Sequence, residues 1–258
     1  IKSTFLGVLT PTLLLVAPTV MAAHDSYETT QKSAASLDQS QPHARISAVE
    51  GTLHARGPYD NEPEALTLNS VIREGDEVYT ESGTFAEIEF VGGSFVRLAG
   101  GTTLVMEQLE DVIRLALVHG AVYLSRGENS NPASIVAFAG RVALDVDSVV
   151  RVDLEPGDSR FGIRVSAGQT EVLTDTSNII LGKSQTLLNQ DSHSRQGHWK
   201  DSDRDAFDDW SDARESSIRG YNPPAFVDAD QYDGLYELED QGEWVVYEEK
   251  RYWKPTVD

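Results

Sequence analysis

The chain has 258 residues, with 42 acidic and 21 basic side chains, so its formal net charge is −21. It contains no cysteine, which excludes disulfide frameworks, cysteine-ligated metal sites and cysteine nucleophiles. Because nucleic-acid affinity depends on Lys and Arg side chains that neutralise phosphates, the acidic balance also argues against a nucleic-acid partner. The length is sufficient for one sizeable core with an appended segment.

The first segment has the features of an export signal. Lys2 precedes an apolar run from Phe5 to Val16, and small residues follow as far as Ala22. The run is shorter than the ~18 residues usual for a membrane span, and prolines interrupt it. We therefore expect residues 1–22 to be a signal peptide cleaved after Ala22, with membrane contact only through this signal. The mature protein would be periplasmic or secreted.

Residues 23–43 are polar, rich in Ser, Thr and Gln, and show no hydrophobic periodicity. Such a composition buries too little apolar surface to offset the entropy lost on ordering. We expect a flexible linker here.

Residues 44–190 contain short runs in which apolar and polar residues alternate. Alternation rich in Val, Ile, Phe and Thr indicates β-strands, and a leading glycine marks a bend or a close backbone approach. We expect an all-β domain, either a small β-solenoid with parallel rungs or a compact sandwich of antiparallel strands. Recurrence of the glycine-led unit favours the solenoid. The runs begin at Gly51, Gly83, Gly93, Gly101, Gly120, Gly140 and Gly168.

Within this region, residues 86–98 predict a hairpin with residues 92–94 as its turn. The expected register places apolar pairs on the core side and a charged pair on the solvent side. The pairs are Ile88 with Leu98, Phe90 with Val96, and Glu89 with Arg97.

Glu87 and Glu89 share one face of the same strand. Paired carboxylates are the catalytic groups of glycosidases. On an alternating strand, however, the polar face is normally the solvated one. We therefore assign no catalytic role to either residue.

Several motifs, in this order along the chain, resemble the FecR-like domain. The most specific is Gly75-Asp-Glu-Val-Tyr-Thr80 followed by the alternating run from Gly83 to Phe90, and further similar segments extend from Arg45 to Gln185. The resemblance implies a β-rich domain on the outer side of the inner membrane. In the best-known members it relays an iron–siderophore signal from an outer-membrane transducer to a sigma factor.

Those members carry a cytoplasmic anti-sigma segment and a membrane span before the domain, whereas a signal-like stretch and a linker precede it here. The resemblance therefore implies the fold and an interaction role, and does not extend to sigma-factor control.

Residues 201–212 place carboxylates at positions 1, 3, 5, 9 and 12 of an EF-hand calcium loop. The position that needs glycine is Ala206, however, and Asp212 replaces the usual bidentate glutamate. A helix fits better, with acidic residues in its first turn. We predict an acidic helix over residues 199–220, capped by Ser202 or Asp203.

The remaining chemistry-bearing motifs are missing from the sequence. No nucleophile elbow, phosphate-binding loop or dinucleotide fingerprint occurs. The histidines also lack metal-ligand spacing, so we predict no cofactor and no metal. The six histidines are His24, His43, His54, His119, His193 and His198.

Residues 221–258 resemble the Trp/Tyr/Pro repeat region that follows FecR-like domains in many secreted bacterial proteins. Aromatic side chains flanked by polar residues can stack on sugar rings or anchor a partner protein. We expect an irregular tail that docks onto the domain or packs on itself. Its candidate partner-binding residues are Trp244, Tyr247, Tyr252 and Trp253.

Together these features predict a non-enzymatic, exported envelope protein that acts through protein–protein contacts in sensing or scaffolding. One alternative is a carbohydrate- or peptidoglycan-binding module. A second is an enzyme similar to the β-helix polysaccharide lyases, which rests on fold analogy alone. The expected partner is an envelope protein or a cell-wall polysaccharide.

Overall fold

The computed structural model describes most of the chain from residue 43 onward. The expected signal peptide at residues 1–22 lies outside the described residues, as does the expected linker at 23–43 apart from its last residue. Within the described ranges, no helix is long and apolar enough to cross a membrane. These ranges are 43–137, 140–155, 160–174, 177–190, 193–221, 224, 226, 234–238 and 241–256.

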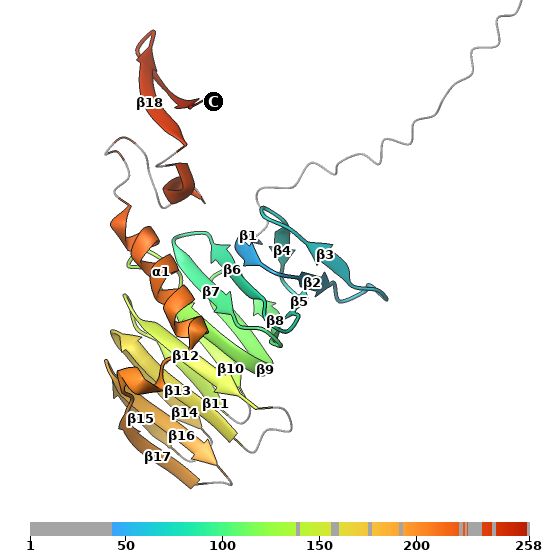
Figure 1. Ribbon diagram of the computed structural model, residues 1–258, viewed down its shortest axis with the longest axis vertical. Coiled ribbons are helices and arrows are strands. Elements are labelled where there is room, and N and C mark those ends of the chain that lie inside the picture. Colours follow the sequence, from blue (N-terminus) through green and yellow to red (C-terminus); the bar gives the residue numbers. More distant parts are fainter. Residues whose placement is uncertain are drawn as a thin grey trace, which may run out of the picture. The chain divides into compact units, whose positions relative to one another are not determined.

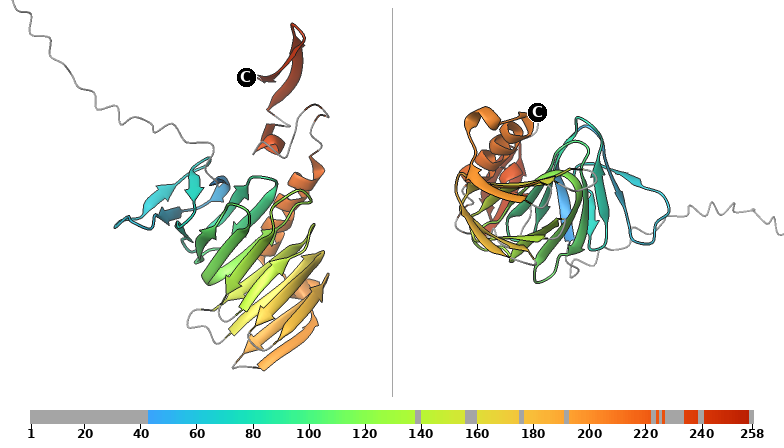
Figure 2. Two further views of the ribbon diagram at one scale, coloured as in Figure 1. Left: turned by 180° about the vertical axis from the view of Figure 1, so that it is seen from behind. Right: turned by 90° about the horizontal axis from the view of Figure 1, so that it is seen from below.

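Strands β1 to β17 follow one another in roughly chain order along two facing sheets (Figures 1 and 2). The strands are β1 (His43–Glu50), β2 (Leu53–Arg56), β3 (Glu64–Leu66), β4 (Val71–Arg73), β5 (Glu77–Thr80), β6 (Phe85–Phe90), β7 (Ser94–Leu98), β8 (Thr103–Gln108), β9 (Ile113–Ser125), β10 (Ala133–Ala137), β11 (Gly140–Leu144), β12 (Val149–Leu154), β13 (Arg160–Ala167), β14 (Gln169–Thr174), β15 (Asn178–Gly182), β16 (Gln185–Gln190) and β17 (His193–His198).

Sheet A has the order β4-β1-β6-β7-β9-β12-β13-β16-β17, and sheet B has the order β3-β2-β5-β8-β9-β10-β11-β14-β15. Strand β9 belongs to both, because its first part pairs with β8 and β10 and its last part with β7 and β12. Among the described strands, only β9 and β10 pair in parallel. The all-β prediction is confirmed, and the antiparallel pairing is that of a sandwich rather than of the solenoid that we favoured.

Apolar side chains from alternate positions of both sheets meet between them and form one buried core. This is the arrangement that period-2 alternation produces when one face of each sheet is turned inward. The core includes Ile46, Ile88, Val96, Leu104, Leu115, Leu124, Ile135, Val152, Val172 and Leu187.

The hairpin β6–β7 has a register different from the predicted one. Phe90 lies opposite Ser94, and Glu87 lies opposite Arg97. The chain reverses over residues 91–93, closed by a hydrogen bond from the Gly93 N–H to the Phe90 carbonyl (3.2 Å), so Ser94 already belongs to the strand. The shift is by two residues, so every side chain keeps its predicted face.

Side-chain hydroxyl groups form hydrogen bonds with the backbone at corners where the chain passes from one sheet to the other. In each case the hydroxyl donates to a backbone carbonyl and accepts from the backbone N–H of the same residue, at 2.6–3.1 Å. The residue bound in this way follows a glycine, so Gly51, Gly120 and Gly168 mark crossings between the sheets and not parallel rungs. The pairs are Thr84 with Thr52, Thr102 with Ala121, and Ser148 with Gln169.

Helix α1 (Ala206–Gly220) follows the sandwich after a short 3-10 turn, η1 (Asp201–Asp203). The predicted helix is confirmed, but its cap is Asp205 rather than Ser202 or Asp203, because those two residues belong to η1, which ends before the helix begins. Asp205 and Asp208 form a reciprocal capping box, in which each side chain accepts the backbone N–H of the other (2.9 Å). The calcium-loop alternative does not fit residues that are helical from 206 onward.

The tail contains a second short 3-10 turn, η3 (Leu235–Leu238), and a hairpin of β18 (Gly242–Tyr247) and β19 (Lys250–Pro255). We had expected an irregular tail. Glu248 and Glu249 form the two-residue turn, both with positive φ (47° and 64°). Asn-Gly and Asp-Gly are the usual sequences for such a turn, so this charged pair gave no recognisable hairpin signal.

Substitution of Gly120 tests the close approach of its backbone to Thr102 at one corner between the sheets. Gly120 has φ of +101°, and a β-carbon there would lie 2.5 Å from the Thr102 Cα. Gly101 also has positive φ (+71°) but open space around it, so it is the matched control. We expect Gly101→Ala to lower the free energy of unfolding by about 1 kcal/mol from backbone strain alone. Gly120→Ala should lower it several-fold more, because Thr102 must also move. Urea denaturation measures both, and equal losses would contradict the close approach.

Candidate functional site

Helix α1 covers the outer face of sheet A, where one row of side chains crosses five neighbouring strands. Cross-strand pairing aligns Glu87, Arg97, Tyr123, Arg151 and Arg164 from β6, β7, β9, β12 and β13. All five point away from the core, since they alternate with the buried apolar residues of their strands. Three arginines in one covered row require carboxylate partners, because burying a charge without a partner is very costly.

At one end of the row, Arg97 and Glu87 form an ion pair whose side chains are both 0% exposed. Arg97 Nε donates to Glu87 Oε2 at 2.7 Å, and its Nη1 donates to Glu215 Oε2 of α1 at 2.9 Å. The other oxygen of Glu87 accepts from Arg214 Nη2 (2.6 Å) and from the Ser47 hydroxyl (2.9 Å). The expectation that Glu87 lies on a solvated face is therefore wrong, because α1 covers that face.

The electrostatics of Glu87 follow from these contacts. Burial opposes its ionisation, but the positive charges of Arg97 and Arg214 and their hydrogen bonds hold its pKa below the usual value. A carboxylate held ionised in this way is a poor general acid. Its role here is to bind two arginines.

Glu89 is also buried, with 4% of its surface exposed. It forms an ion pair with Arg45 of β1 and accepts a hydrogen bond from the Gly234 N–H (3.0 Å). Arg45 also binds Glu237 of η3, at 2.9 Å. These contacts attach η3 to sheet A, so Glu89 joins the first strand of the domain to the segment after α1.

Tyr236 of η3 completes this end of the interface. Its hydroxyl accepts from Arg214 Nη2 (2.9 Å) and donates to Glu87 Oε1 (3.3 Å). Burial and the negative charges of Glu87 and Glu89 raise the pKa of Tyr236, so the phenol stays protonated and can donate.

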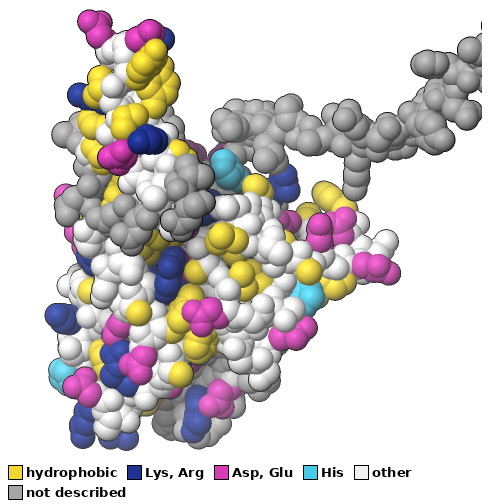
Figure 3. Space-filling model, turned by 45° about the horizontal axis from the view of Figure 1, so that its top comes forward, with side chains coloured by type: hydrophobic (Ala, Val, Ile, Leu, Met, Phe, Trp, Pro, Cys, Tyr) yellow, Lys and Arg dark blue, Asp and Glu magenta, His cyan; other side chains and the backbone are white. Residues whose placement is uncertain are grey.

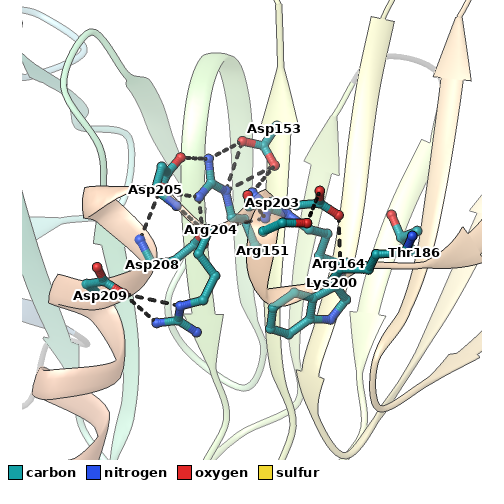
Figure 4. A network of polar contacts seen from close by, with 12 residues as sticks. Arg151, Asp153, Arg164, Thr186, Lys200, Asp203, Arg204, Asp205, Asp208 and Asp209 are labelled. Atoms are coloured by element: carbon teal, nitrogen blue, oxygen red, sulfur yellow. Dashed lines mark hydrogen bonds and ion pairs between the residues drawn. The ribbon is translucent and has the colours of Figure 1, made fainter.

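At the other end of the row, Arg151 binds three aspartates (Figure 4). Its nitrogens lie 2.7 Å from Asp153 Oδ1, 2.9 Å from Asp205 Oδ2 and 2.7 Å from Asp208 Oδ1. Asp208 is 1% exposed and also accepts from the Tyr123 hydroxyl at 2.7 Å. The N-terminus of α1 is thus fixed to β9 and β12 through its capping residues.

Arg164 extends this cluster to β13. Its Nη1 lies 3.4 Å from Asp208 Oδ2 and donates to the Asp203 carbonyl at 3.2 Å. Burial opposes the ionisation of Asp205, but hydrogen bonds from Arg151 and from the Asp208 N–H hold its pKa at about 2. Asp205 is therefore ionised at neutral pH and contributes a negative charge beside Arg151.

Aromatic side chains pack between the two polar ends. Phe207 of α1 stacks on Phe85 with ring centroids 5.6 Å apart and lies 5.5 Å from the ring of Tyr123. Trp210 lies 5.5 Å from Phe85, and its indole N–H donates to Glu50 Oε1 at 2.7 Å. The helix is held by an apolar centre with ion pairs on both sides, an arrangement that fixes its position on the sheet.

The four aromatic residues predicted as partner contacts lie on the hairpin β18–β19 and divide into two pairs. Trp244 and Trp253 oppose each other across the strands, with ring centroids 5.4 Å apart, and Phe226 packs against Trp244 at 5.5 Å. Tyr247 and Tyr252 remain 65% and 47% exposed. The tryptophans therefore pack within the hairpin, whereas the tyrosines remain exposed to solvent.

Sequence reasoning missed the network beneath α1. The available signal was the combination of arginines at outward strand positions with acidic residues on one helix face. Asp208, Ser211 and Glu215 are spaced i, i+3, i+7, and all face the sheet. Nothing in the local pattern shows which strand face such a helix covers.

Replacement of Arg97 tests the buried pair. Arg97→Met keeps the side-chain length but leaves Glu87 and Glu215 without this cation. We expect a loss of about 3–5 kcal/mol in the free energy of unfolding, as for other broken buried ion pairs. Arg114→Met, which breaks an exposed pair with Glu107 on sheet B, should cost less than about 1 kcal/mol. Similar small losses in thermal or urea unfolding of both variants would refute the role of Arg97.

Acidification tests the charge of Asp205. Its pKa is lower in the folded state (about 2) than in the unfolded state, so its contribution is present above the unfolded value of ~3.9 and is lost as pH falls towards 2. Asp205→Asn removes the charge and keeps a good cap. We expect the variant to be less stable at pH 7 by about 1 kcal/mol, a small value because this side chain is half-exposed. The difference should vanish near pH 2; a difference independent of pH would contradict the assignment.

Comparison with known proteins gives no family for the chain. No family model matches it, and no curated protein matches it. Two crystal structures, each of a provisionally assigned anti-sigma factor from Parabacteroides distasonis ATCC 8503, are similar to it with TM-scores of 0.45 and 0.43. Their sequence identities are 14% and 15%, and each alignment covers 70% of this chain and 99% of that chain.

Proposed function

We propose that this chain is a non-catalytic, exported protein of the bacterial envelope that binds a partner protein in sensing or scaffolding. The hairpin β18–β19 would make the contact, and the sandwich with α1 would be its rigid support. The observation that carries the proposal is the exposure of large apolar side chains on the hairpin.

Val246, Tyr247 and Tyr252 are 69%, 65% and 47% exposed, and Figure 3 shows apolar side chains gathered on this hairpin. Tyrosine is enriched in protein interfaces because it offers a rigid apolar ring with a polar tip. The packed pair of Trp244 and Trp253 holds these side chains on a preformed β-ribbon, which lowers the entropy lost on binding.

The non-catalytic part of the proposal is supported by the contacts of Glu87 and Glu89, the two carboxylates whose spacing resembles a catalytic pair. Glu87 is bound by Arg97, Arg214, Ser47 and Tyr236, and Glu89 by Arg45 and the Gly234 N–H. These contacts use both carboxylates to attach α1 and η3 to sheet A.

Export is supported by the apolar run and small residues at positions 1–22 of the sequence. The similarity of the chain to FecR-like domains, read from its motifs, agrees with an interaction role in the envelope.

Site-specific cross-linking tests the hairpin. A photoreactive amino acid at position 247 of the full chain should give a discrete protein adduct in envelope fractions. The same group at Tyr59, which is 95% exposed on the β-domain, is the control and should not give that adduct. Tyr252→Ser should reduce the adduct formed from position 247 at least several-fold, because it removes the neighbouring ring.

An adduct that forms equally well from position 59, or none from position 247, would contradict the proposal. Co-sedimentation with insoluble cell-wall polysaccharide that depends on Tyr247 and Tyr252 would instead assign the hairpin to a glycan.

A further inference from the structure

A second feature of sheet A lies beyond the N-terminal end of α1, where a pocket of about 370 Å³ opens on the outer face of the sheet. Its floor is formed by Gly162 of β13 and Leu188 of β16, which lie directly opposite each other. Asp153, Arg164 and Trp199 are among the residues that surround it. Figure 4 shows Asp153 and Arg164 beside Thr186 and Asp203 in this region.

The pocket exists because position 162 has no side chain. A β-carbon there would lie 3.3 Å from Leu188 Cδ2 and 3.8 Å from the Asp153 Cβ, in the space that the pocket now occupies. Glycine inside a strand weakens it and marks a place where another group approaches the backbone closely. Leu188 is 50% exposed, so the floor is apolar and accessible.

Trp199 supplies a fixed aromatic wall. Its backbone N–H donates to the Ser184 carbonyl and its indole N–H to the Val165 carbonyl, both at 3.3 Å. The side chain is therefore held at both ends and remains partly exposed. A preformed apolar surface of this kind suits a ligand with a flat apolar face.

The polar groups around the pocket carry both signs. Asp153, Glu155 and Asp203 are acidic, whereas Arg160, Arg164 and the exposed His198 are donors or cations. Arg160 pairs with Glu155 at 3.1 Å, and Arg164 is shared between Asp153 and Asp208. Three carboxylates against two guanidinium groups disfavour an anionic ligand, and acceptors beside donors match hydroxyl groups, which both donate and accept.

We propose that this pocket binds a pyranose ring of a neutral saccharide, with the apolar face of the sugar on Trp199 and Leu188 and its hydroxyl groups towards Asp153 and Arg164. The volume lies near the lower end of the 300–1,000 Å³ usual for ligand pockets, which limits the site to one or two rings. The site is separate from the hairpin and goes beyond its proposed protein contact.

The test uses the full chain and ligand-observed saturation-transfer NMR with cellobiose, maltose and N,N′-diacetylchitobiose. We expect transfer from the wild type to at least one disaccharide. Gly162→Val, which fills the floor, and Trp199→Ala, which removes the wall, should each weaken binding at least tenfold. Gly182→Ala on sheet B, where a β-carbon would make only an ordinary contact, is the control and should bind as the wild type does.

A second arm distinguishes a free sugar from a polymer. Sedimentation with insoluble cellulose, starch or chitin that is lost in Gly162→Val, without disaccharide binding, assigns the pocket to a polysaccharide chain. Circular dichroism verifies folding, and if Trp199→Ala does not fold, Gly162→Val decides alone. No binding of any probe by the wild type, or binding unchanged in Gly162→Val, overturns the proposal. Tyr247→Ser should leave saccharide binding intact, so failure of the hairpin contact would be seen separately.

Discussion

The covered row of arginines on sheet A is the constraint on which the arrangement of this chain depends. Arg97, Arg151 and Arg164 point outward from neighbouring strands, and burial without partners would cost far more than a domain of this size gains from folding. Helix α1 supplies Asp205, Asp208 and Glu215, so it completes the sheet rather than simply following it. The folded unit therefore extends at least through the end of α1.

Stability and specificity have different sources here. The apolar core between the sheets accounts for the driving force of folding, whereas buried ion pairs return little net stability because desolvation offsets their attraction. Arg97 illustrates this balance, since its Nη2 has no hydrogen-bond partner in the described residues. What the pairs determine is the position of α1, and through Glu89 and Glu237 the position of η3 on Arg45.

The sequence predicted which face of a strand a residue occupies better than it predicted what covers that face. Alternation placed Ile88 and Leu98 in the core correctly, although the register was wrong by two residues. Alternation also placed Glu87 correctly on the outer face of its strand. That face is nevertheless buried, because helix α1, more than one hundred residues later in the chain, covers it. Glycines were read as bends correctly and as solenoid rungs wrongly, because local spacing does not distinguish a crossing between sheets from a turn within one.

The two halves of the outer face of sheet A are linked through Arg164. On the α1 side, Arg164 contacts Asp208, and on the open side it lines the pocket together with Asp153. If the helix were absent, both Arg151 and Arg164 would face the pocket region without the aspartates of α1, and the local field would attract anions. Docking of the helix removes this bias. The excess of carboxylates over arginines near Gly162 and Trp199, which disfavours an anionic ligand, therefore depends on the same ion pairs that fix α1 on the sheet.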